Sequence, residues 1–503
     1  MPNTLADWLT YLESLHPKTI ALGLERVAQV KQRLNLQPDF PIIVVGGTNG
    51  KGSVCAMLES ILHAAGYRVG CYTSPHLLHY NERVRIAKRL ASDAELCASF
   101  ESIELARTGK IESHDSASPS LALPRGERGQ VPESSEIPLT YFEFGTLAAM
   151  QCFIAHKVEV AILEVGLGGR LDAVNVFDND CAVIASVDID HTDYLGDTRE
   201  KIAFEKAGIF RAGRVAVCAD VDVPLAMAEY AEKIGAELWR IGREFGFDGG
   251  SPSLALKGPL AIRLGGQITP TKSLVIPRWE REKKAPPVEE GISLPSPNGG
   301  GLGGGQWNYH SKVGTRSSLP YPALRGAFQL NNASAALAAL DVLKDRLPVS
   351  MGAVRRGLGE VQLAGRFQFV PGRPTLILDV AHNPHAARSL AQNLASLPPC
   401  PNTFAVFAML KDKDIAGVIA ALDPHIDTWL AAGIVTPRGA TAEQVEQMLQ
   451  QGRVRGEILN CGNISEALRY AYKAADENDR IIAFGSFHTV AEVMAAKGLS
   501  VTE

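Results

Sequence analysis

Short apolar runs alternate with helix-forming runs along most of the chain. Each apolar run is followed by a run with helical periodicity, which is the pattern of consecutive β-α-β units. Such units place their strands in parallel sheets that are covered by helices. We therefore predict an α/β fold. The predicted strands are Ile42–Val45, Val158–Val165, Cys181–Ile189, Arg214–Ala219, Thr375–Asp379, Thr403–Ala408 and Ile481–Phe484.

Two segments interrupt this alternation. Residues Thr108–Pro138 are rich in Ser, Pro, Gly and Glu and have no periodic apolar face, so we expect a mobile surface insertion there. Residues Gly249–Pro320 contain the glycine-rich run Asn298–Gly305, which is typical of a flexible linker, although Leu256–Val275 has some strand character. We expect no chemistry in either insertion, which we place at about 108–138 and 249–320.

Composition and charge exclude several classes of protein. The net charge of -5 over 503 residues gives no electrostatic reason to expect nucleic acid or a membrane surface as a partner. Eight scattered cysteines without a Cys-x-x-Cys spacing indicate neither a zinc site nor a disulfide framework. The N-terminus lacks a signal peptide, and the chain has no run of about 18 apolar residues. These features favour a cytoplasmic enzyme with small-molecule substrates.

A glycine-rich turn follows the first predicted strand. Residues Gly46–Ser53 read Gly-Gly-Thr-Asn-Gly-Lys-Gly-Ser, and the helical run Val54–His63 comes directly after them. Glycines allow the backbone to approach phosphate oxygens, the N–H groups of the following helix point at the anion, and Lys51 supplies positive charge. Ser53 lies one place later than the hydroxyl of a standard P-loop, because Gly52 follows the lysine. We predict a nucleotide triphosphate site; a glycine turn that only packs tightly is the alternative.

A carboxylate ends another predicted strand. Glu164 closes the apolar run Val158–Leu163 and opens a second glycine-rich turn. Ligands of open α/β sheets lie at the carboxyl edge of the strands, and Mg²⁺ prefers oxygen ligands, so Glu164 is a candidate metal ligand. A capping or ion-paired glutamate is the alternative. The turn contains Gly166 and Gly168 but not the third glycine of a dinucleotide fingerprint, so we reject a Rossmann cofactor site.

Several longer motifs resemble those of the folylpolyglutamate synthases, in particular the bacterial bifunctional enzymes that are also dihydrofolate synthases, within the Mur ligase superfamily. The resemblance covers the chain except the two insertions. It implies a P-loop, Mur ligase-like ATPase domain over residues 1–362 and a smaller, Rossmann-like α/β domain over residues 363–503. The motifs are Gly47–Ser53, Tyr72–Leu77, Tyr80–Arg83, Thr140–Phe144, Glu164–Ala173, Asp190–Asp193, Glu205–Ile209 and Asp379–Pro384.

The resemblance also implies roles for individual residues at the metal and substrate sites. Two Mg²⁺ ions are implied, with Ser53, Ser74, Glu164 and His191 as ligands, together with a carbamylated Lys206; K⁺ is a further candidate cation. Without the resemblance, His191 would read as a packed or surface histidine and Lys206 as a solvated lysine. The pterin-bearing substrate is assigned to Phe142, Arg170, Leu171 and Asp172.

The remaining implied residues belong to the nucleotide and glutamate sites. Besides Asn49, Gly50, Lys51, Gly52 and Ser53, the nucleotide is assigned to Asn332, Arg366 and Asp379. Asn332 as a helix N-cap is the structural alternative. His382 and Ser486, with His488 nearby, are assigned to the incoming glutamate, and a hydrogen-bonded loop histidine is the alternative for His382. The predicted catalytic residues are Lys51, Lys206, Arg366 and His382.

The resulting hypothesis is an ATP-dependent acid–amino-acid ligase. The γ-phosphoryl group moves to a carboxylate of dihydropteroate or a folate, and the α-amine of L-glutamate displaces phosphate from the acyl phosphate. Transfer between residues far apart in sequence implies catalysis in a cleft between two domains. A P-loop kinase, a nucleotide switch and a muramyl ligase are the rivals. We expect a monomer.

Overall fold

The computed structural model describes residues 2–16, 20–110, 136–249, 306–326 and 328–501. Its main sheet has the strand order β4-β3-β2-β5-β1-β6-β7-β8. The strands from β2 to β8 in this order run parallel, while β3 and β4 are added antiparallel at one edge. The bounds are β1 Ile42–Gly46, β2 Val69–Tyr72, β3 Val84–Ile86, β4 Arg89–Leu90, β5 Val160–Glu164, β6 Cys181–Ile184, β7 Val215–Cys218 and β8 Glu237–Arg240.

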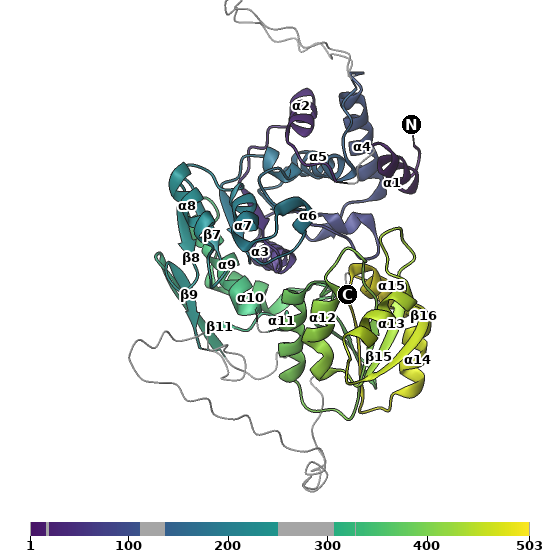
Figure 1. Ribbon diagram of the computed structural model, residues 1–503. Helices are drawn as coiled ribbons and strands as arrows, with labels where there is room; N and C mark the ends of the chain where they lie inside the picture. The colour runs from purple at the N-terminus through teal and green to yellow at the C-terminus, as the bar shows by residue number, and fades with distance from the viewer. Residues whose placement is uncertain (1, 17–19, 111–135, 250–305, 327, 502–503) are drawn as a thin grey trace, which may run out of the picture.

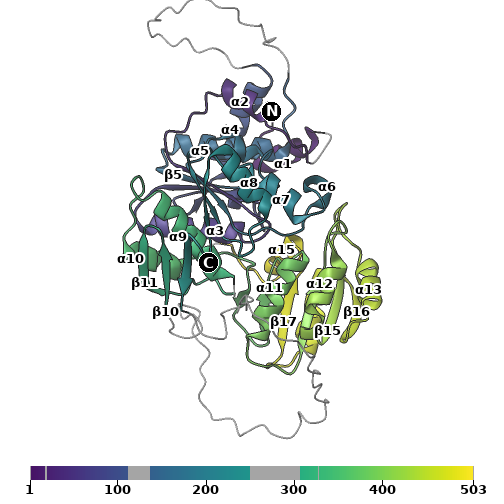
Figure 2. The same ribbon diagram turned by 60° about the vertical axis from the view of Figure 1, so that its left-hand side comes forward.

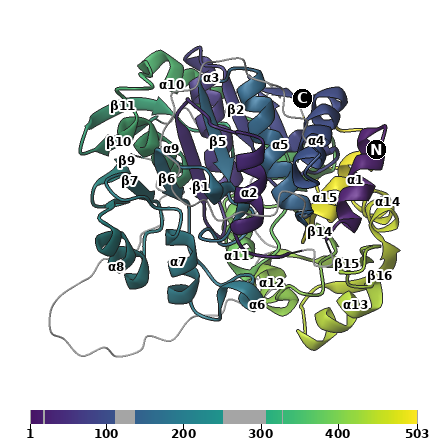
Figure 3. The ribbon, with the colours of Figure 1, turned by 90° about the horizontal axis from the view of Figure 1, so that it is seen from above.

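Helices cover both faces of this sheet. Figures 2 and 3 show α3, α9 and α10 on one side of the strands and α1, α2, α4 and α5 on the other. Short 3₁₀ turns at Tyr80–Arg83 and Ala173–Val176 connect strands and helices. The helices of this part are α1 Leu5–Ser14, α2 Glu25–Arg33, α3 Lys51–Ala64, α4 Asp93–Arg107, α5 Tyr141–Ala155, α6 Thr192–Leu195, α7 Arg199–Ala207, α8 Leu225–Ile234, α9 Gln329–Val342 and α10 Met351–Glu360.

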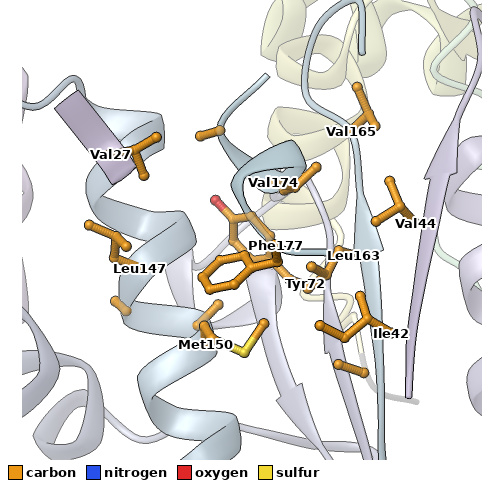
Figure 4. Packing of buried hydrophobic residues seen from close by; sticks show 14 of the residues in the cluster. Val27, Ile42, Val44, Tyr72, Leu147, Met150, Leu163, Val165, Val174 and Phe177 are labelled. Atoms are coloured by element: carbon orange, nitrogen blue, oxygen red, sulfur yellow. The ribbon is translucent and has the colours of Figure 1, made fainter. Parts of the chain in front are cut away.

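The continuous apolar character of the central strands follows from this double cover. Along β1, Ile42 and Val44 belong to the core beneath α2 and α5, whereas Ile43 and Val45 belong to the core beneath α3 and α9. Successive side chains of a strand point to opposite faces, so every position of β1 is buried. Figure 4 shows the first of these cores, with Leu147 of α5 facing the strand residues.

A second sheet is built from the C-terminal part of the chain, in the order β12-β13-β17-β14-β15-β16. Only β12 pairs antiparallel, with β13. Figure 1 shows this part, coloured green to yellow, beside the purple and teal N-terminal part. The elements are β12 Gln368–Val370, β13 Thr375–Leu378, α11 Pro384–Ala395, β14 Thr403–Phe407, α12 Ile415–Leu422, the 3₁₀ turn Asp423–His425, β15 Thr428–Gly433, α13 Ala442–Gln451, β16 Glu457–Asn463, α14 Ile464–Ala474, β17 Arg480–Phe484 and α15 Phe487–Ala496.

The predicted α/β fold with two helix-covered sheets is confirmed, and the predicted linker is wrong at its C-terminal end. Residues 306–320 form β10 Gln306–Ser311 and β11 Gly314–Pro320. In a small antiparallel sheet, β10 pairs with β11 on one side and with β9 Phe245–Asp248 on the other. Trp307 and Tyr309 anchor this sheet in the main core, which the Ser- and Gly-rich context hid. The strand character expected at Leu256–Val275 and the run Asn298–Gly305 lie outside the described residues.

The first predicted insertion, at about 108–138, includes residues that belong to the folded part of the chain. Ile137 is buried, and its N–H donates to the carbonyl of Arg107 at 3.0 Å, so the chain is already docked there. Residues 111–135 lie outside the described part. Between the two large sheets, α10 ends at Glu360 and β12 begins at Gln368. The exact domain boundary at 362/363 stays a prediction.

Among the helices that the structure describes, none combines the length and the apolar character that a bilayer span requires.

Candidate active site between two sheets

A cavity of about 740 Å³ opens where the carboxyl edges of the two large sheets meet. The main sheet contributes the turn before α3 and the ends of β5 and β6, and the C-terminal part contributes the segments after β13 and β17. Every predicted site residue except Arg170 lines this cavity, namely Asn49, Gly50, Lys51, Gly52, Ser53, Ser74, Phe142, Glu164, Leu171, Asp172, His191, Lys206, Asn332, Arg366, Asp379, His382 and Ser486. Residues spread over most of the chain therefore face a single space.

The turn before α3 has the geometry of an anion site. Gly50 caps the helix with a left-handed φ of 86°, so the first N–H groups of α3 face the cavity without a side-chain cap. A Cβ at Gly50 would lie 2.6 Å from Oδ1 of Asn332, so this position needs glycine for space as well. Lys51 Nζ donates to the carbonyls of Gly47 and Thr48, at 3.0 and 3.2 Å. The charged amine thus lies beside the helix N-terminus, where both attract phosphate.

Glu164 lies at the same edge because of strand register. It pairs with Val45, the next-to-last residue of β1, so its carboxylate lies beside the glycine turn. Its Oε2 accepts from the N–H of Ser74 at 3.1 Å, and its Oε1 would lie 3.8 Å from a Cβ at Gly52. Burial raises the pKa of Glu164, and Lys51 opposes that shift. A buried carboxylate flanked by the hydroxyl-bearing Ser53 and Ser74 offers hard oxygen ligands.

The predicted metal ligands are of mixed type. No group of three or more His, Cys, Asp or Glu side chains suited to a metal ion is found in the described part of the chain. The predicted set of Ser53, Ser74, Glu164 and His191 contains two hydroxyls, so it is not a group of that kind. Magnesium keeps several water and phosphate ligands and needs few protein groups, so the residues present fit Mg²⁺ held together with nucleotide phosphates.

His191 is part of a charged cluster that joins the two parts of the molecule. The side chain of Asp190 is only 10% exposed and accepts from Lys413 Nζ at 2.7 Å, and the His191 Nε2 atom lies 3.4 Å from the same amine. Burial opposes ionisation of Asp190, but His191 and Lys413 outweigh it and hold the pKa of Asp190 well below its ordinary value. Burial lowers the pKa of His191 to about 4, so the ring is neutral at pH 7. A neutral imidazole retains the lone pair that a metal ligand needs.

Lys206 is buried without an ion-pair partner among the described residues. Its side chain extends from α7 into the cavity, and among the described residues no carboxylate lies within ion-pair distance of it. Burial lowers its pKa to about 7, and the positive charge of Lys51 contributes to the shift. Lysines are rarely buried unless they are paired, so an amine in this position is unusual. At neutral pH a large fraction of Lys206 is the uncharged amine.

The aromatic residues at the start of α5 have different surroundings. Phe144 is fully buried in the core, whereas Phe142 lines the cavity. A Cβ at Gly166 would come within 2.7 Å of the Phe142 ring, so this glycine lets the ring lie against the backbone. The helix begins at Tyr141, because Thr140 caps it and forms a capping box with Glu143.

Of the three residues that the glycine turn after β5 was predicted to place at the pterin, only two line the cavity. Leu171 and Asp172 line it, and burial raises the pKa of Asp172 to about 7. Arg170 instead donates to Glu205 at 2.9 Å, and its guanidinium lies 5.8 Å from the centroid of the Phe204 ring. Arg170 therefore faces α7 in this structure.

Two residues of the C-terminal part reach across to the glycine turn. A Cβ at Gly52 would lie 3.8 Å from an Arg366 Nη atom, and that guanidinium stacks on the Phe487 ring at 5.1 Å. Burial lowers the pKa of Arg366. Asp379 uses both carboxylate oxygens to accept from the N–H groups of Phe367 and Ala381, at 2.9 and 2.8 Å. It thus fixes the loop that carries Arg366, and burial raises its pKa to about 6.

His382 and Ser486 also line the cavity, with structural contacts of their own. His382 Nδ1 lies 2.8 Å from the Val380 carbonyl, which can only accept, so Nδ1 carries the proton and Nε2 the lone pair. Burial lowers the pKa of His382 to about 4. Ser486 caps α15 by accepting from Thr489 N–H at 3.0 Å, and His488 lines the cavity in the first turn of that helix.

Asn332 does not have the role of helix cap. Helix α9 begins at Gln329, so Asn332 lies inside its first turn, where it is buried and donates to Gln329 Oε1 at 3.0 Å. Its amide is held against Gly50, and a structural cap is thereby excluded as the reason for this asparagine.

The sequence interpretation missed Lys413 and the contacts around Asn383. Lys413 follows β14 at its carboxyl end, the same signal that identified Glu164, but the surrounding Lys-Asp repeat resembles a solvated loop. Asn383 donates to Asp190 Oδ2 at 3.0 Å, and Asn49 Nδ2 lies 2.8 Å from His385 Nδ1. These contacts tie the glycine turn and Asp190 directly to the start of α11.

Comparison with known proteins is consistent with this geometry. Residues 131–248 match the Mur ligase middle domain, and residues 365–487 match the Mur ligase glutamate ligase domain. The dihydrofolate synthase/folylpolyglutamate synthase of Escherichia coli (strain K12) is 39% identical, over 97% of this chain and 94% of that protein. Its counterpart from Haemophilus influenzae is 37% identical over 98% of this chain and 97% of its own length.

Comparison with solved structures indicates the same family. Escherichia coli FolC in complex with DHPP and ADP is 38% identical, covers 99% of both chains and gives a TM-score of 0.78. A bifunctional folylpolyglutamate synthase/dihydrofolate synthase with Mn, AMPPNP and L-glutamate bound is 41% identical, covers 99% of this chain and 98% of its own, and gives a TM-score of 0.76. With a P-loop, a buried carboxylate and a second sheet meeting at one cavity, this chain belongs to the dihydrofolate synthase/folylpolyglutamate synthase family of Mur ligases.

Proposed function

We propose that this protein is an ATP-dependent ligase that adds L-glutamate to dihydropteroate and to folates. The observation that carries the proposal is the convergence at Gly52. Glu164 of the main sheet and Arg366 of the C-terminal part both lie 3.8 Å from the position of a Cβ there. A nucleotide held by the glycine turn would therefore meet a carboxylate on one side and a cation from the other part of the molecule.

The first step activates the acceptor carboxylate. The γ-phosphorus of ATP breaks its bond to the β,γ-bridging oxygen and forms a bond to a carboxylate oxygen of the acceptor, which gives an acyl phosphate and ADP. Lys51 and the N–H groups of α3 hold the phosphates, and Arg366 faces the negative charge of the phosphoryl group in transfer. Positioning and charge neutralisation supply the catalysis.

The second step forms the amide. The α-amine of L-glutamate attacks the acyl carbon, the bond from carbon to the phosphate oxygen breaks, inorganic phosphate leaves and the amine proton passes to solvent. His382 offers an Nε2 lone pair in the cavity, which can accept a hydrogen bond from the amine and orient it. Phe142 and Asp172 also line the cavity, where they would hold the pterin.

Ser53, Ser74, Glu164 and His191 would hold divalent cations that neutralise phosphate charge. We further propose that Lys206 is carbamylated. A buried amine with a pKa of about 7 is nucleophilic toward CO₂ at neutral pH, and the carbamate would replace an unpaired cation by a metal-binding anion. K⁺ as an additional cation, a monomeric state and a cytoplasmic location stay predictions, as does the division into domains at residues 362/363.

Phosphate release tests the function against its rivals. We expect release to require both L-glutamate and an acceptor, dihydropteroate or tetrahydrofolate, and mass spectrometry to show acceptor lengthened by one glutamate. A kinase would instead give a stable phosphorylated acceptor without glutamate. A nucleotide switch would release phosphate slowly whatever small molecules are added, and a muramyl ligase would need UDP-linked acceptors.

Isotope transfer tests the acyl phosphate separately. With ¹⁸O in the reacting carboxylate, one labelled oxygen should appear in the released phosphate, since the acceptor oxygen leaves with phosphorus. Unlabelled phosphate together with amide formation would contradict the proposed intermediate.

A further inference from the structure

Arg83 is a cation in the cavity wall whose charge no acid neutralises. It lies in the 3₁₀ turn before β3 and lines the cavity, yet none of the described carboxylates is its ion-pair partner. Arg85, two residues farther, is by contrast paired with the buried Glu59 at 2.9 Å. An unpaired guanidinium facing a cavity has its binding capacity available for an anionic ligand.

The surroundings hold Arg83 in one orientation. Its Nε donates to His76 Nδ1 at 2.9 Å, and its planar group lies 5.4 and 5.5 Å from the ring centroids of Tyr80 and Tyr141. Among the described residues, the two terminal Nη groups have no hydrogen-bond acceptor. A guanidinium fixed through Nε and stacked between rings presents its Nη donors as a fork that matches a carboxylate.

His76 adds a donor to the same site. Because its Nδ1 accepts from Arg83, the ring proton lies on Nε2, which is therefore a hydrogen-bond donor. The loop that carries His76 is itself fixed, since the buried Glu82 carboxylate accepts from the N–H groups of Leu77, Leu78 and His79 at 2.6 to 2.7 Å. The site is therefore formed in advance of any ligand.

The position of Arg83 relates it to the reaction. Its carbonyl accepts from the N–H of Thr73 at 2.9 Å, and the next residue, Ser74, donates to Glu164. On the other side, Tyr141 contacts the guanidinium and is followed directly by Phe142. Arg83 is thus linked through Thr73 to the proposed metal ligands and through Tyr141 to the residues proposed for the pterin.

The two proposed acceptors differ in what they could offer this site. Dihydropteroate ends in one carboxylate, which is the reacting group. A folate ends in a glutamate whose γ-carboxylate reacts while its α-carboxylate stays a spectator anion a few bonds away. We propose that Arg83 and His76 form a subsite for the α-carboxylate of the terminal glutamate of a folate acceptor. The inference rests on the proposed function and makes Arg83 a determinant of acceptor choice.

Arg83→Gln tests this assignment by comparing two acceptors with one enzyme. A charge-assisted bidentate contact corresponds to about a ten- to hundred-fold effect, so we expect the KM for tetrahydrofolate to rise by that factor. With dihydropteroate, kcat and KM should stay within about two-fold. Arg89→Gln removes an exposed arginine of β4 nearby and should change neither acceptor.

A modified acceptor completes the test. Tetrahydrofolate with its α-carboxylate converted to a carboxamide should show the raised KM with the unmodified protein, and Arg83→Gln should weaken it no further. Equal losses with both acceptors would overturn the inference, because they would place Arg83 at the incoming L-glutamate or in the fold. Additive losses with the carboxamide would overturn it as well.

Arg83→Lys is the control that distinguishes loss of the subsite from a folding defect. It keeps the charge and the apolar stem but lacks the fork, so a smaller rise in KM, again confined to tetrahydrofolate, is expected. If the unmodified protein added glutamate to neither acceptor, the proposed function would fail and this inference with it. Activity on dihydropteroate with the predicted split absent would refute the Arg83 subsite alone.

Discussion

Replacement of Lys206 by methionine should stabilise the protein while it abolishes ligation. The pKa of Lys206 falls from an ordinary 10.5 to about 7, and each pH unit of difference corresponds to about 1.4 kcal/mol. The buried amine therefore costs about 4 to 5 kcal/mol of folding free energy at pH 7. Methionine has a similar length and no charge, and imperfect packing would take back about 1 kcal/mol or more. We expect a net gain of about 2 to 4 kcal/mol.

The pH dependence of this gain has a definite sign. Between pH 7 and 10.5 the unfolded chain binds the Lys206 proton and the folded protein does not, so the stability of the unmodified protein rises with pH in this window. The penalty is fully present below pH 7 and disappears as pH approaches 10.5. The advantage of the methionine variant should therefore be about 2 kcal/mol smaller at pH 9 than at pH 7.

Urea unfolding at pH 7, 8 and 9, in CO₂-free buffer with a chelator, measures the stability gain of Lys206→Met and its dependence on pH. Lys201→Met is the matched control, because Lys201 lies in the same helix with a side chain that is 63% exposed, and it should show no such gain. If Lys206→Met is no more stable than the unmodified protein at pH 7, or if its advantage does not shrink with pH, the unpaired buried amine is the wrong description. Added bicarbonate and Mg²⁺ should stabilise the unmodified protein and leave the variant unchanged, as carbamylation requires.

Three further predictions concern the glycine turn, the contact between the two parts and a buried glycine. Lys51→Ala should abolish glutamate-dependent ADP release with unchanged circular dichroism; retained release would exclude Lys51 from the phosphate site. Lys413→Ala leaves Asp190 buried without its amine and should lower kcat at least ten-fold and stability by about 3 kcal/mol, whereas the exposed Lys411→Ala should do neither. Gly208→Ala places a Cβ only 2.6 Å from the Cα of Arg170, so it should lower the free energy of unfolding by at least about 2 kcal/mol in urea. An unchanged free energy of unfolding would show that the backbone of Arg170 can move away from this position.

The α/β class, the P-loop and most residues of the cavity follow from the amino-acid sequence alone. Continuous apolar strands such as Ile42–Val45 indicate that the sheet is covered on both faces. The glycine turn before α3 indicates that the backbone there must come close to an anion. The position of Glu164 at a strand end was enough to place it at the ligand edge. These signals are local, because each depends on neighbours along the chain.

Contacts between residues far apart in the sequence became known from the three-dimensional fold. The 306–320 strands form because Trp307 and Tyr309 find the main core, a gain that no local propensity records. Lys413 and Asp190, 223 residues apart, pair across the two sheets, and Arg170 turns to Glu205 and away from the cavity. Arg83 is available to a ligand because no carboxylate of the described residues pairs with it. The partner and the burial of a charged side chain depend on which residues surround it in the folded protein. These residues are distant in the sequence, so a local sequence pattern does not identify them.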